Sequence, residues 1–325
     1  MKQPPLIVIG GLNTDIVAKG VRKFPGPGEH TYGKGLYIGP GGKSRNIAAM
    51  AGALLSKGQV AMIGRTTKDS FGLWKLPLES LELSGVNSSF VHIIPAHETD
   101  KLPAIALITV NETGENQIIV LPGISEDFDT SDIDRAQALF DEASSSAGLL
   151  CATFECPPDT VEYAFAKAKA MNIRALFDPG GIESKEQAIK LLKSGVFLIK
   201  PNEHEAQIIT GIDIRDLQTA QKAADKLLEL GAENVMITHA EHGAYLFTDE
   251  GQGIHIPTDP RITGNTKDAT GCGDQTMAVL VAALQSGKSL EDAARAAVAA
   301  GTMQFYKSGI QPITAAELAS SGHKL

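Results

Sequence analysis

Short, continuous runs of apolar residues recur along the chain, and such runs are typical of strands buried on both faces. Between them, apolar residues recur at the spacing of an α-helix. We expect strands at residues 6–9, 59–63, 148–151, 173–177, 196–199, 234–238 and 243–247, and helices at 47–55, 71–83, 131–140, 275–285 and 290–305. Strands that alternate with helices predict an α/β fold, in which helices flank a doubly wound, mostly parallel sheet with right-handed crossovers.

Two stretches depart from this alternation and carry β-type residues without a helical period. Residues 16–38 are interrupted by a Pro- and Gly-rich segment at 24–29, and the runs within 104–121 flank a polar turn, as in a hairpin. We interpret 16–38 and 104–121 as a small β-sheet lid. Residues 1–15, 39–103 and 122–325 then form one large α/β domain.

Composition and charge limit the partners of such a domain. The 325 residues are 43% hydrophobic, which is ample for a large core. The 29 Lys and Arg residues against 38 Asp and Glu residues give a net charge of −9. This balance argues against a general nucleic-acid or membrane surface, so any phosphate site must be local.

Cysteine usage and the distribution of apolar residues indicate the compartment. Cys151, Cys156 and Cys272 lack the spacing of a zinc site or of a disulfide framework. The first residues show no secretory signal pattern, and no apolar run approaches the ~18 residues that suggest a membrane span. We therefore expect a soluble, cytoplasmic protein.

The loop at 268–274 carries the most specific chemistry. Gly271, Cys272 and Gly273 precede the apolar helix expected at 275–285, so their N–H groups can face one point at a helix N-terminus and bind an anion. In the first turn, Asp274 is kept ionised by the helix dipole and can accept a proton from an alcohol. The loop predicts phosphoryl transfer to a hydroxyl.

A purely structural interpretation of this loop exists as well. Asp268 or Asp274 could cap the helix while the glycines only form a turn.

Polar side chains at the ends of two strands are candidates for holding the acceptor. Asn13 and Asp15 follow the strand at 6–9, and Glu155 follows the strand at 148–151. The carboxyl ends of parallel strands form the ligand-binding edge of an open α/β sheet. The alternatives are an Asx turn at Asn13 and Asp15, and a charge at a helix N-terminus for Glu155.

The segment 41–46 is a second Gly-rich motif before a helix. It is not a P-loop, because that motif would require glycine where the chain has Tyr37. It resembles the Gly-Gly-Lys-Gly-x-Asn signature of the ribokinase family of sugar and nucleoside kinases, with matches at Gly42, Lys43 and Asn46.

The catalytic loop resembles the same family. Its run from 268 to 274 is similar to the signature Asp-Thr-x-Gly-Ala-Gly-Asp, with Ala269 and Cys272 as small replacements. The resemblance extends over nearly the whole chain and implies the family's fold with its small lid.

The resemblance also implies the activity and the site. It implies an ATP-dependent kinase that phosphorylates a hydroxymethyl group of a ribose-like sugar, with Asp274 as base. The sugar or nucleoside would lie between the lid and the large domain, which also holds the nucleotide. The residues implied to bind the acceptor are Asn13, Asp15, Gly42, Lys43, Asn46 and Glu155.

Several cofactor contacts are implied in the same way. The nucleotide would contact Asn202, Glu205, Thr238, Gly243 and Gly273. Mg2+ would be held by Glu205 through water. A monovalent cation, K+, would be held by Asp268, Thr270 and Gly309, and the lid would form a homodimer.

Two other functions remain open. A nucleoside kinase of the pseudouridine or adenosine type would use the same fold, and Arg45 just before Asn46 is similar to pseudouridine kinases. A non-catalytic sugar-binding regulator would keep Asp15 and Asn46 but would not need Asp274 and its glycines.

Overall fold

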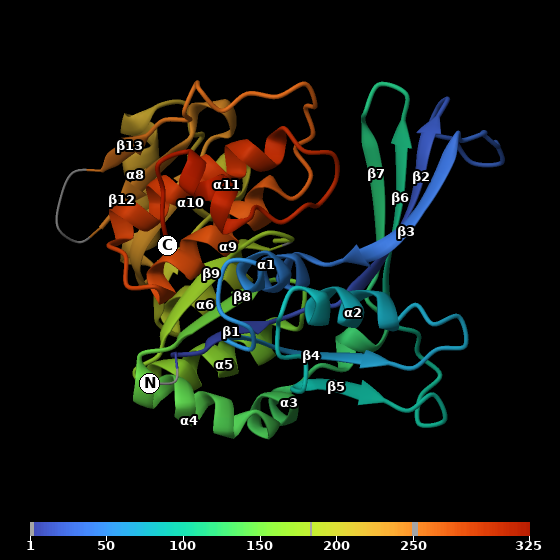
Figure 1. Ribbon diagram of the computed structural model, residues 1–325, viewed down its shortest axis with the longest axis horizontal. Helices are drawn as coiled ribbons and strands as arrows, with labels where there is room; N and C mark the ends of the chain where they lie inside the picture. Colours follow the sequence, from blue (N-terminus) through green and yellow to red (C-terminus); the bar gives the residue numbers. More distant parts are fainter. Residues whose placement is uncertain (1–2, 183, 249–252) are drawn as a thin grey trace.

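The computed structural model describes residues 3–182, 184–248 and 253–325, and its largest feature is a nine-stranded sheet (Figure 1). The strands of this sheet, in spatial order, are β13 (Ile254–Ile256), β12 (Ala244–Phe247), β11 (Ala232–Thr238), β10 (Val196–Ile199), β9 (Arg174–Asp178), β8 (Leu149–Thr153), β1 (Leu6–Ile9), β4 (Val60–Thr67) and β5 (Val91–Ile94). From β11 to β5 all neighbours are parallel, whereas β12 and β13 are antiparallel additions at one edge.

Helices cover both faces of the sheet and make two separate hydrophobic cores. One face packs against α1 (Lys43–Gly52), α2 (Lys75–Leu83), α9 (Cys272–Gln285), α10 (Leu290–Phe305) and α11 (Ala315–Ser320). The other packs against α3 (Thr130–Arg135), α4 (Gln137–Ser146), α5 (Pro158–Ala170), α6 (Lys185–Lys193), α7 (Glu203–Thr210) and α8 (Leu217–Glu229).

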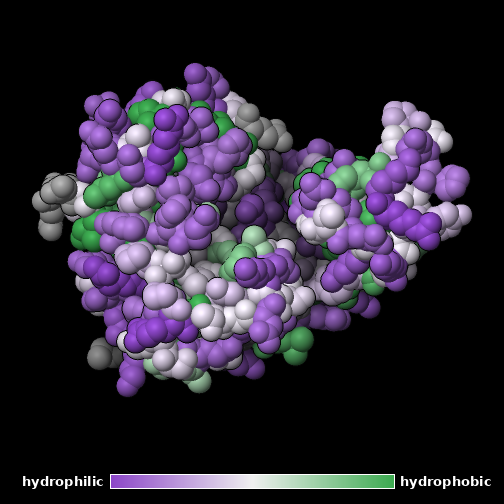
Figure 2. Space-filling view, turned by 90° about the horizontal axis from the view of Figure 1, so that it is seen from above, coloured by the Kyte–Doolittle hydropathy of each residue, from purple (hydrophilic) through white to green (hydrophobic). Residues whose placement is uncertain are grey.

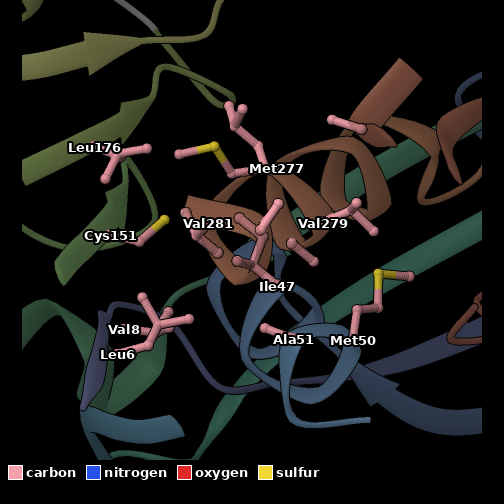
Figure 3. Packing of buried hydrophobic residues seen from close by; sticks show 14 of the residues in the cluster. Leu6, Val8, Ile47, Met50, Ala51, Cys151, Leu176, Met277, Val279 and Val281 are labelled. Atoms are coloured by element: carbon pink, nitrogen blue, oxygen red, sulfur yellow. The ribbon is translucent and has the colours of Figure 1, made fainter. Parts of the chain in front are cut away.

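Strand β1 shows why the apolar runs are continuous. Leu6 and Val8 belong to the core of α1 and α9, whereas Ile7 and Ile9 belong to the core on the opposite face. Figure 3 shows Leu6 and Val8 facing Ile47 of α1. Because successive side chains of a strand point to opposite faces, a strand covered on both sides must be apolar at every position. The predicted doubly wound, mostly parallel sheet is confirmed.

A second, smaller sheet projects from this body. It has four strands in the order β3 (Gly35–Gly41), β2 (Asn13–Val21), β6 (Ala104–Asn111) and β7 (Asn116–Leu121). Figure 1 shows these strands standing away from the nine-stranded sheet, and in Figure 2 the surface is hollowed where they meet the body. The smaller sheet thus begins at Asn13, directly beside the candidate acceptor residues.

One predicted helix is divided in two. The expected helix at 131–140 is two helices, α3 and α4, with Ala136 between them at φ −94° and ψ 16°. The first begins with a capping box formed by Asp129 and Asp132. The short strands β5 and β13 were not expected from the apolar pattern.

Within residues 3–182, 184–248 and 253–325, none of the helices combines the length and the apolar character that crossing a bilayer requires.

Candidate active site

The N-terminus of α9 forms the floor of the candidate site. Gly271 precedes the helix with φ 74°, a conformation that glycine adopts without strain. The N–H groups of Gly271, Gly273 and Asp274 donate to no atom of the described residues, whereas that of Cys272 donates to the Ala269 carbonyl at 3.2 Å. Of the predicted anion-binding donors, Cys272 is therefore occupied within the loop and the two glycines are open.

The Asp274 carboxylate is buried and is held from the side of α1. Asn46 Nδ2 donates to Asp274 Oδ2 at 2.7 Å, and Lys43 Nζ lies 3.6 Å from Asp274 Oδ1. The charge of Asp274 is the largest cause that raises the pKa of Lys43 above its usual value. The two Gly-rich segments of the sequence therefore meet at this carboxylate, which has one cationic and one amide neighbour.

Arg45 is buried and holds the side chain of Asn46 in place. Its guanidinium donates to the carbonyls of Gly41 at 3.2 Å and Pro40 at 2.7 Å, and also to the side chain of Asn46. Burial lowers the pKa of Arg45 to about 10, so the group stays charged at neutral pH. Arg45 is thus a support for the amide that contacts Asp274 and is not a solvated surface charge.

Asp15 lies on β2 and faces the glycine-rich end of the neighbouring strand β3. A Cβ added to Gly41 would fall 1.8 Å from Asp15 Oδ1, so only glycine leaves room for this carboxylate. Burial is the largest cause that raises the pKa of Asp15 to about 6; the charge of Arg45 opposes it, and the nearby charge of Asp274 adds to it. Asp15 and Asp274 therefore share one electrostatic environment, and Asn13 starts the same strand.

Glu155, just after β8, contacts the start of α1. The N–H of Ser44 donates to Glu155 Oε2 at 3.0 Å, and Ser44 Oγ is 2.7 Å from Thr153 Oγ1. Burial raises the pKa of Glu155 to about 7 in spite of the backbone N–H groups of Lys43 and Ser44. The start of α1 is thereby tied to the carboxyl end of β8.

The candidate nucleotide residues gather at the ends of β10 and β11. Asn202 and Glu205 form a capping box at the start of α7, with Glu205 N donating to Asn202 Oδ1 at 2.8 Å and Asn202 N donating to Glu205 Oε2 at 2.9 Å. Thr238 forms a β-bridge with Asn202. Gly243 ends the turn at the next strand with φ 91°, where a Cβ would fall 2.1 Å from the Ile256 carbonyl oxygen.

A buried ion pair that was not predicted from the sequence lies between the candidate acceptor residues and the candidate nucleotide residues. Lys200 Nζ lies 2.8 Å from Asp178 Oδ2, and both side chains are buried. A Cβ on Gly180, two residues after Asp178, would fall 2.8 Å from Cε of Lys43. Burial and the charge of Asp178 raise the pKa of Glu205. Asp178 and Lys200 each follow a predicted strand directly, which is the same signal that selected Glu155.

Within the described parts of the chain, no group of three or more His, Cys, Asp or Glu side chains is arranged to hold a metal ion. Glu205 supplies a carboxylate beside the candidate nucleotide residues, and a carboxylate with waters is a usual ligand set for Mg2+.

The loop before Gly271 is fastened to the C-terminal tail. Asp268 Oδ1 accepts from the N–H of Thr270 at 2.9 Å, and Asp268 Oδ2 accepts from the N–H of Gly309 at 2.8 Å. Burial opposes ionisation, but these hydrogen bonds lower the pKa of Asp268 overall. Gln304 donates to the carbonyls of the same two partners, Thr270 and Gly309.

The chain is similar in sequence and in structure to known sugar kinases. The ribokinase of Haemophilus influenzae is 28% identical over 306 residues, covering 94% of each chain. The deoxyribokinase of Salmonella typhi is 29% identical over 269 residues, covering 83% of this chain and 82% of that protein. The structure of Arabidopsis thaliana ribokinase with ribose and ATP superposes with a TM-score of 0.85 at 25% identity, covering 98% of each chain.

The model of the pfkB family of carbohydrate kinases matches residues 4–316. Kinases of this family are phosphotransferases with an alcohol group as acceptor, in agreement with a buried carboxylate beside open N–H groups. The chain therefore belongs to the pfkB family of carbohydrate kinases, and within it to the ribokinase-like sugar kinases.

Proposed function

We propose that the chain transfers the γ-phosphoryl group of ATP to a hydroxymethyl group of a ribose-like sugar. The observation that carries the proposal is the contact between Asn46 and Asp274, which sets an acceptor-binding side chain against the proposed base. Asp274 takes the proton of the hydroxyl. Since phosphoryl transfer passes through a loose transition state, correct placement of the hydroxyl matters more than strong basicity.

The acceptor is held between the lid and α1. Asp15 and Glu155 accept hydrogen bonds from sugar hydroxyls, Asn13 and Asn46 supply amides, and Gly42 and Lys43 form the wall at the start of α1. Gly42 has φ 91°, and a Cβ there would fall 3.0 Å from the Gly11 carbonyl oxygen. The lid excludes water, which would otherwise compete as phosphoryl acceptor.

The nucleotide lies along Asn202, Glu205, Thr238 and Gly243, with its phosphates at the N-terminus of α9. The N–H groups of Gly271 and Gly273 stabilise charge on the phosphoryl oxygens. Mg2+ fits beside Glu205, since a carboxylate with waters is a usual ligand set, and it neutralises phosphate charge when bound. Support for ATP comes from the Arabidopsis thaliana ribokinase structure, which holds ribose and ATP.

A monovalent cation fits Asp268, Thr270 and Gly309 less well than Mg2+ fits Glu205. The side-chain amide of Gln304 already contacts the carbonyl oxygens of Thr270 and Gly309. No step of the proposed reaction is therefore assigned to K+.

The lid supports association into a homodimer. Strand β7 is the outer strand of the smaller sheet, and all six of its residues are exposed. Ile118, Ile119 and Val120 are 54%, 60% and 57% exposed. An apolar edge strand of this kind is a surface that proteins usually cover. We place the enzyme in the cytoplasm, in keeping with three free cysteines in the described chain.

A nucleoside kinase is the second candidate. A base attached to ribose would need room beside the acceptor site, and a cavity of about 70 Å³ opens next to Arg45, Asn46, Ser80 and Ile310. A sugar-binding regulator is disfavoured, since it would have no use for open N–H groups beside a buried carboxylate.

Product analysis tests the proposal. The protein is incubated with ATP and Mg2+ and with ribose, deoxyribose, adenosine or pseudouridine, and the phosphorylated product is identified by mass spectrometry. Phosphorylation of a free pentose supports the sugar kinase, whereas phosphorylation of a nucleoside alone supports the second candidate. If ADP is formed with none of the acceptors in the panel, both substrate assignments fail.

A further inference from the structure

Gln304 stands out among the buried polar residues because it reaches two separate segments of the site. It lies near the end of α10 and is 0% exposed. Its Nε2 donates to the Thr270 carbonyl at 3.2 Å and to the Gly309 carbonyl at 2.6 Å. Thr270 precedes Gly271 of the catalytic loop, and Gly309 belongs to the C-terminal tail. One side chain thus joins the loop to the tail.

The orientation of the Gln304 amide is fixed by its partners. With Nε2 inward, two carbonyl oxygens face a donor; with Oε1 inward, three acceptors would face one another. Oε1 is buried without a hydrogen-bond partner in the described chain. A buried acceptor left without a partner is uncommon. The glutamine therefore gives up one hydrogen bond in order to keep the contact with the two carbonyls.

Asp268 supplies the complementary half of this arrangement. Its carboxylate accepts from the N–H groups of Thr270 and Gly309, and Gln304 donates to the carbonyls of the same two residues. Negative charge meets the two N–H groups, and the positive end of the amide meets the two C=O groups. A cation that contacted both carbonyl oxygens from the same side would coincide with Nε2.

We propose that the Gln304 amide takes the place of a monovalent cation, as a positioning residue for the catalytic loop, so that the enzyme works without K+. This inference rests on the proposed function, in which the loop presents Gly271, Gly273 and Asp274 to the reacting groups. A Cβ on Gly271 would lie 3.9 Å from Gln304 Nε2, so the amide packs against the residue that immediately precedes α9.

The test compares the full-length wild type with Q304E, Q304A and the control Q285A. Gln285 is also a buried glutamine whose Oε1 has no hydrogen-bond partner among the described residues, but it ends α9, at the opposite end of that helix from the loop. Initial rates and thermal unfolding midpoints are measured in KCl and in choline chloride at about 100 mM, so that ionic strength is matched.

We expect the wild type and Q285A to show less than about a twofold difference in rate between the two salts, with equal unfolding midpoints. Q304E sets a carboxylate against two carbonyls and should lose activity in choline chloride. KCl should restore its activity by roughly 5- to 150-fold, the usual range of coupling between two sites, and should raise its midpoint. Q304A should lose activity and stability, and KCl should restore part of both.

Two results would overturn the inference. One is a wild-type enzyme that KCl activates more than about fivefold or stabilises relative to choline chloride. The other is a Q304A variant with normal rate and midpoint in choline chloride. If Q304E fails to fold, Q304A decides. If no acceptor is phosphorylated, the proposed function fails, but the midpoints in the two salts still decide whether Gln304 replaces a cation.

Discussion

Asn46 Nδ2 donates to Asp274 Oδ2 at 2.7 Å, across 228 positions of the chain. The first residue lies on α1 and the second in the first turn of α9, and these two helices pack together on one face of the large sheet. The contact orients the carboxylate, and the carbonyl oxygen of Asn46 is in turn held by Arg45. A substrate hydroxyl that reaches Asn46 is therefore within the environment of Asp274.

Replacing Asp274 by Asn removes the proposed base while it keeps the size of the side chain. We expect turnover to fall by roughly 10²- to 10⁴-fold, with KM for the acceptor largely kept, because the acceptor contacts remain. Steady-state kinetics measures both constants. Asp292→Asn, in the first turn of α10, is the matched control. Near-normal turnover of Asp274→Asn would exclude Asp274 as the base.

Replacing Asn46 by Asp sets a second carboxylate beside Asp274. Like charges disfavour the ionised form, so the pKa of the pair rises and activity at neutral pH falls. We expect the acidic limb of the pH–rate profile to move to higher pH, with part of the activity recovered under alkaline conditions. Profiles of kcat and kcat/KM measure this. An acidic limb at its original pH would show that Asn46 does not act on Asp274.

Replacing Glu155 by Gln should raise the stability of the protein without substrate. Burial raises the pKa of Glu155 from 4.5 to about 7, so the folded state favours the protonated form. The stability that this group contributes is present below pH 4.5 and is lost as the pH rises through about 7. At pH 8 we expect the variant to gain roughly 1–3 kcal/mol in free energy of unfolding.

Urea unfolding at acidic pH and at pH 8 measures this gain, with exposed Glu233→Gln as the control. The same Glu155 variant should show a higher KM for the acceptor, because a carboxylate that accepts from hydroxyls is lost. An unchanged stability difference at the two pH values would contradict a raised pKa at Glu155.

Replacing Glu205 by Gln should weaken the response to Mg2+. The amide oxygen can still accept from the N–H of Asn202, so the capping box at α7 survives. We expect the Mg2+ concentration for half-maximal rate to rise roughly 10- to 100-fold, as for groups that act on a metal through its ligands. Glu203→Gln, in the same helical turn, is the control. An equal response of both variants would remove Glu205 from the metal site.

Replacing Ile119 by Glu should prevent association through the lid. Ile119 is 60% exposed on the outer strand, and a charge there would lose its hydration in an interface. Light scattering coupled to size exclusion should give a dimer for the wild type and a monomer for the variant. Gln117→Asn, on the same strand and without an added charge, should leave the mass unchanged. A monomeric wild type would end the proposal of a lid dimer.

Much of the fold could be predicted because its signals are local. The apolar runs follow from burial of both sheet faces, as Leu6 and Ile7 of one strand show. The helix expected at 290–305 has the bounds of α10, Leu290–Phe305. The break at Ala136 had no local signal, since alanine is a good helix former and neither Gly nor Pro marks the position.

Residues of the candidate site could be predicted where a motif or the end of a strand marked them. Nothing local pairs Asp178 with Lys200, because their partnership depends on neighbouring strands. Gln304 lies in an alanine-rich helix without any motif, and its role appears only when loop and tail are seen together. The raised pKa values of Asp15 and Glu155 follow from burial, which a linear pattern does not measure.

Strand β2 carries Asn13 and Asp15 at its start and is a central strand of the smaller sheet, where β3 and β6 hydrogen-bond it on either side, with a register shift against β6 only between Lys19 and Val21. Hydrogen bonds along both edges restrain the backbone of β2. Asp15 and the body of the smaller sheet therefore belong to one continuous backbone segment and share one position. Under the proposed function, occupancy of Asp15 by the acceptor is mechanically coupled through this one strand to the closure of the smaller sheet.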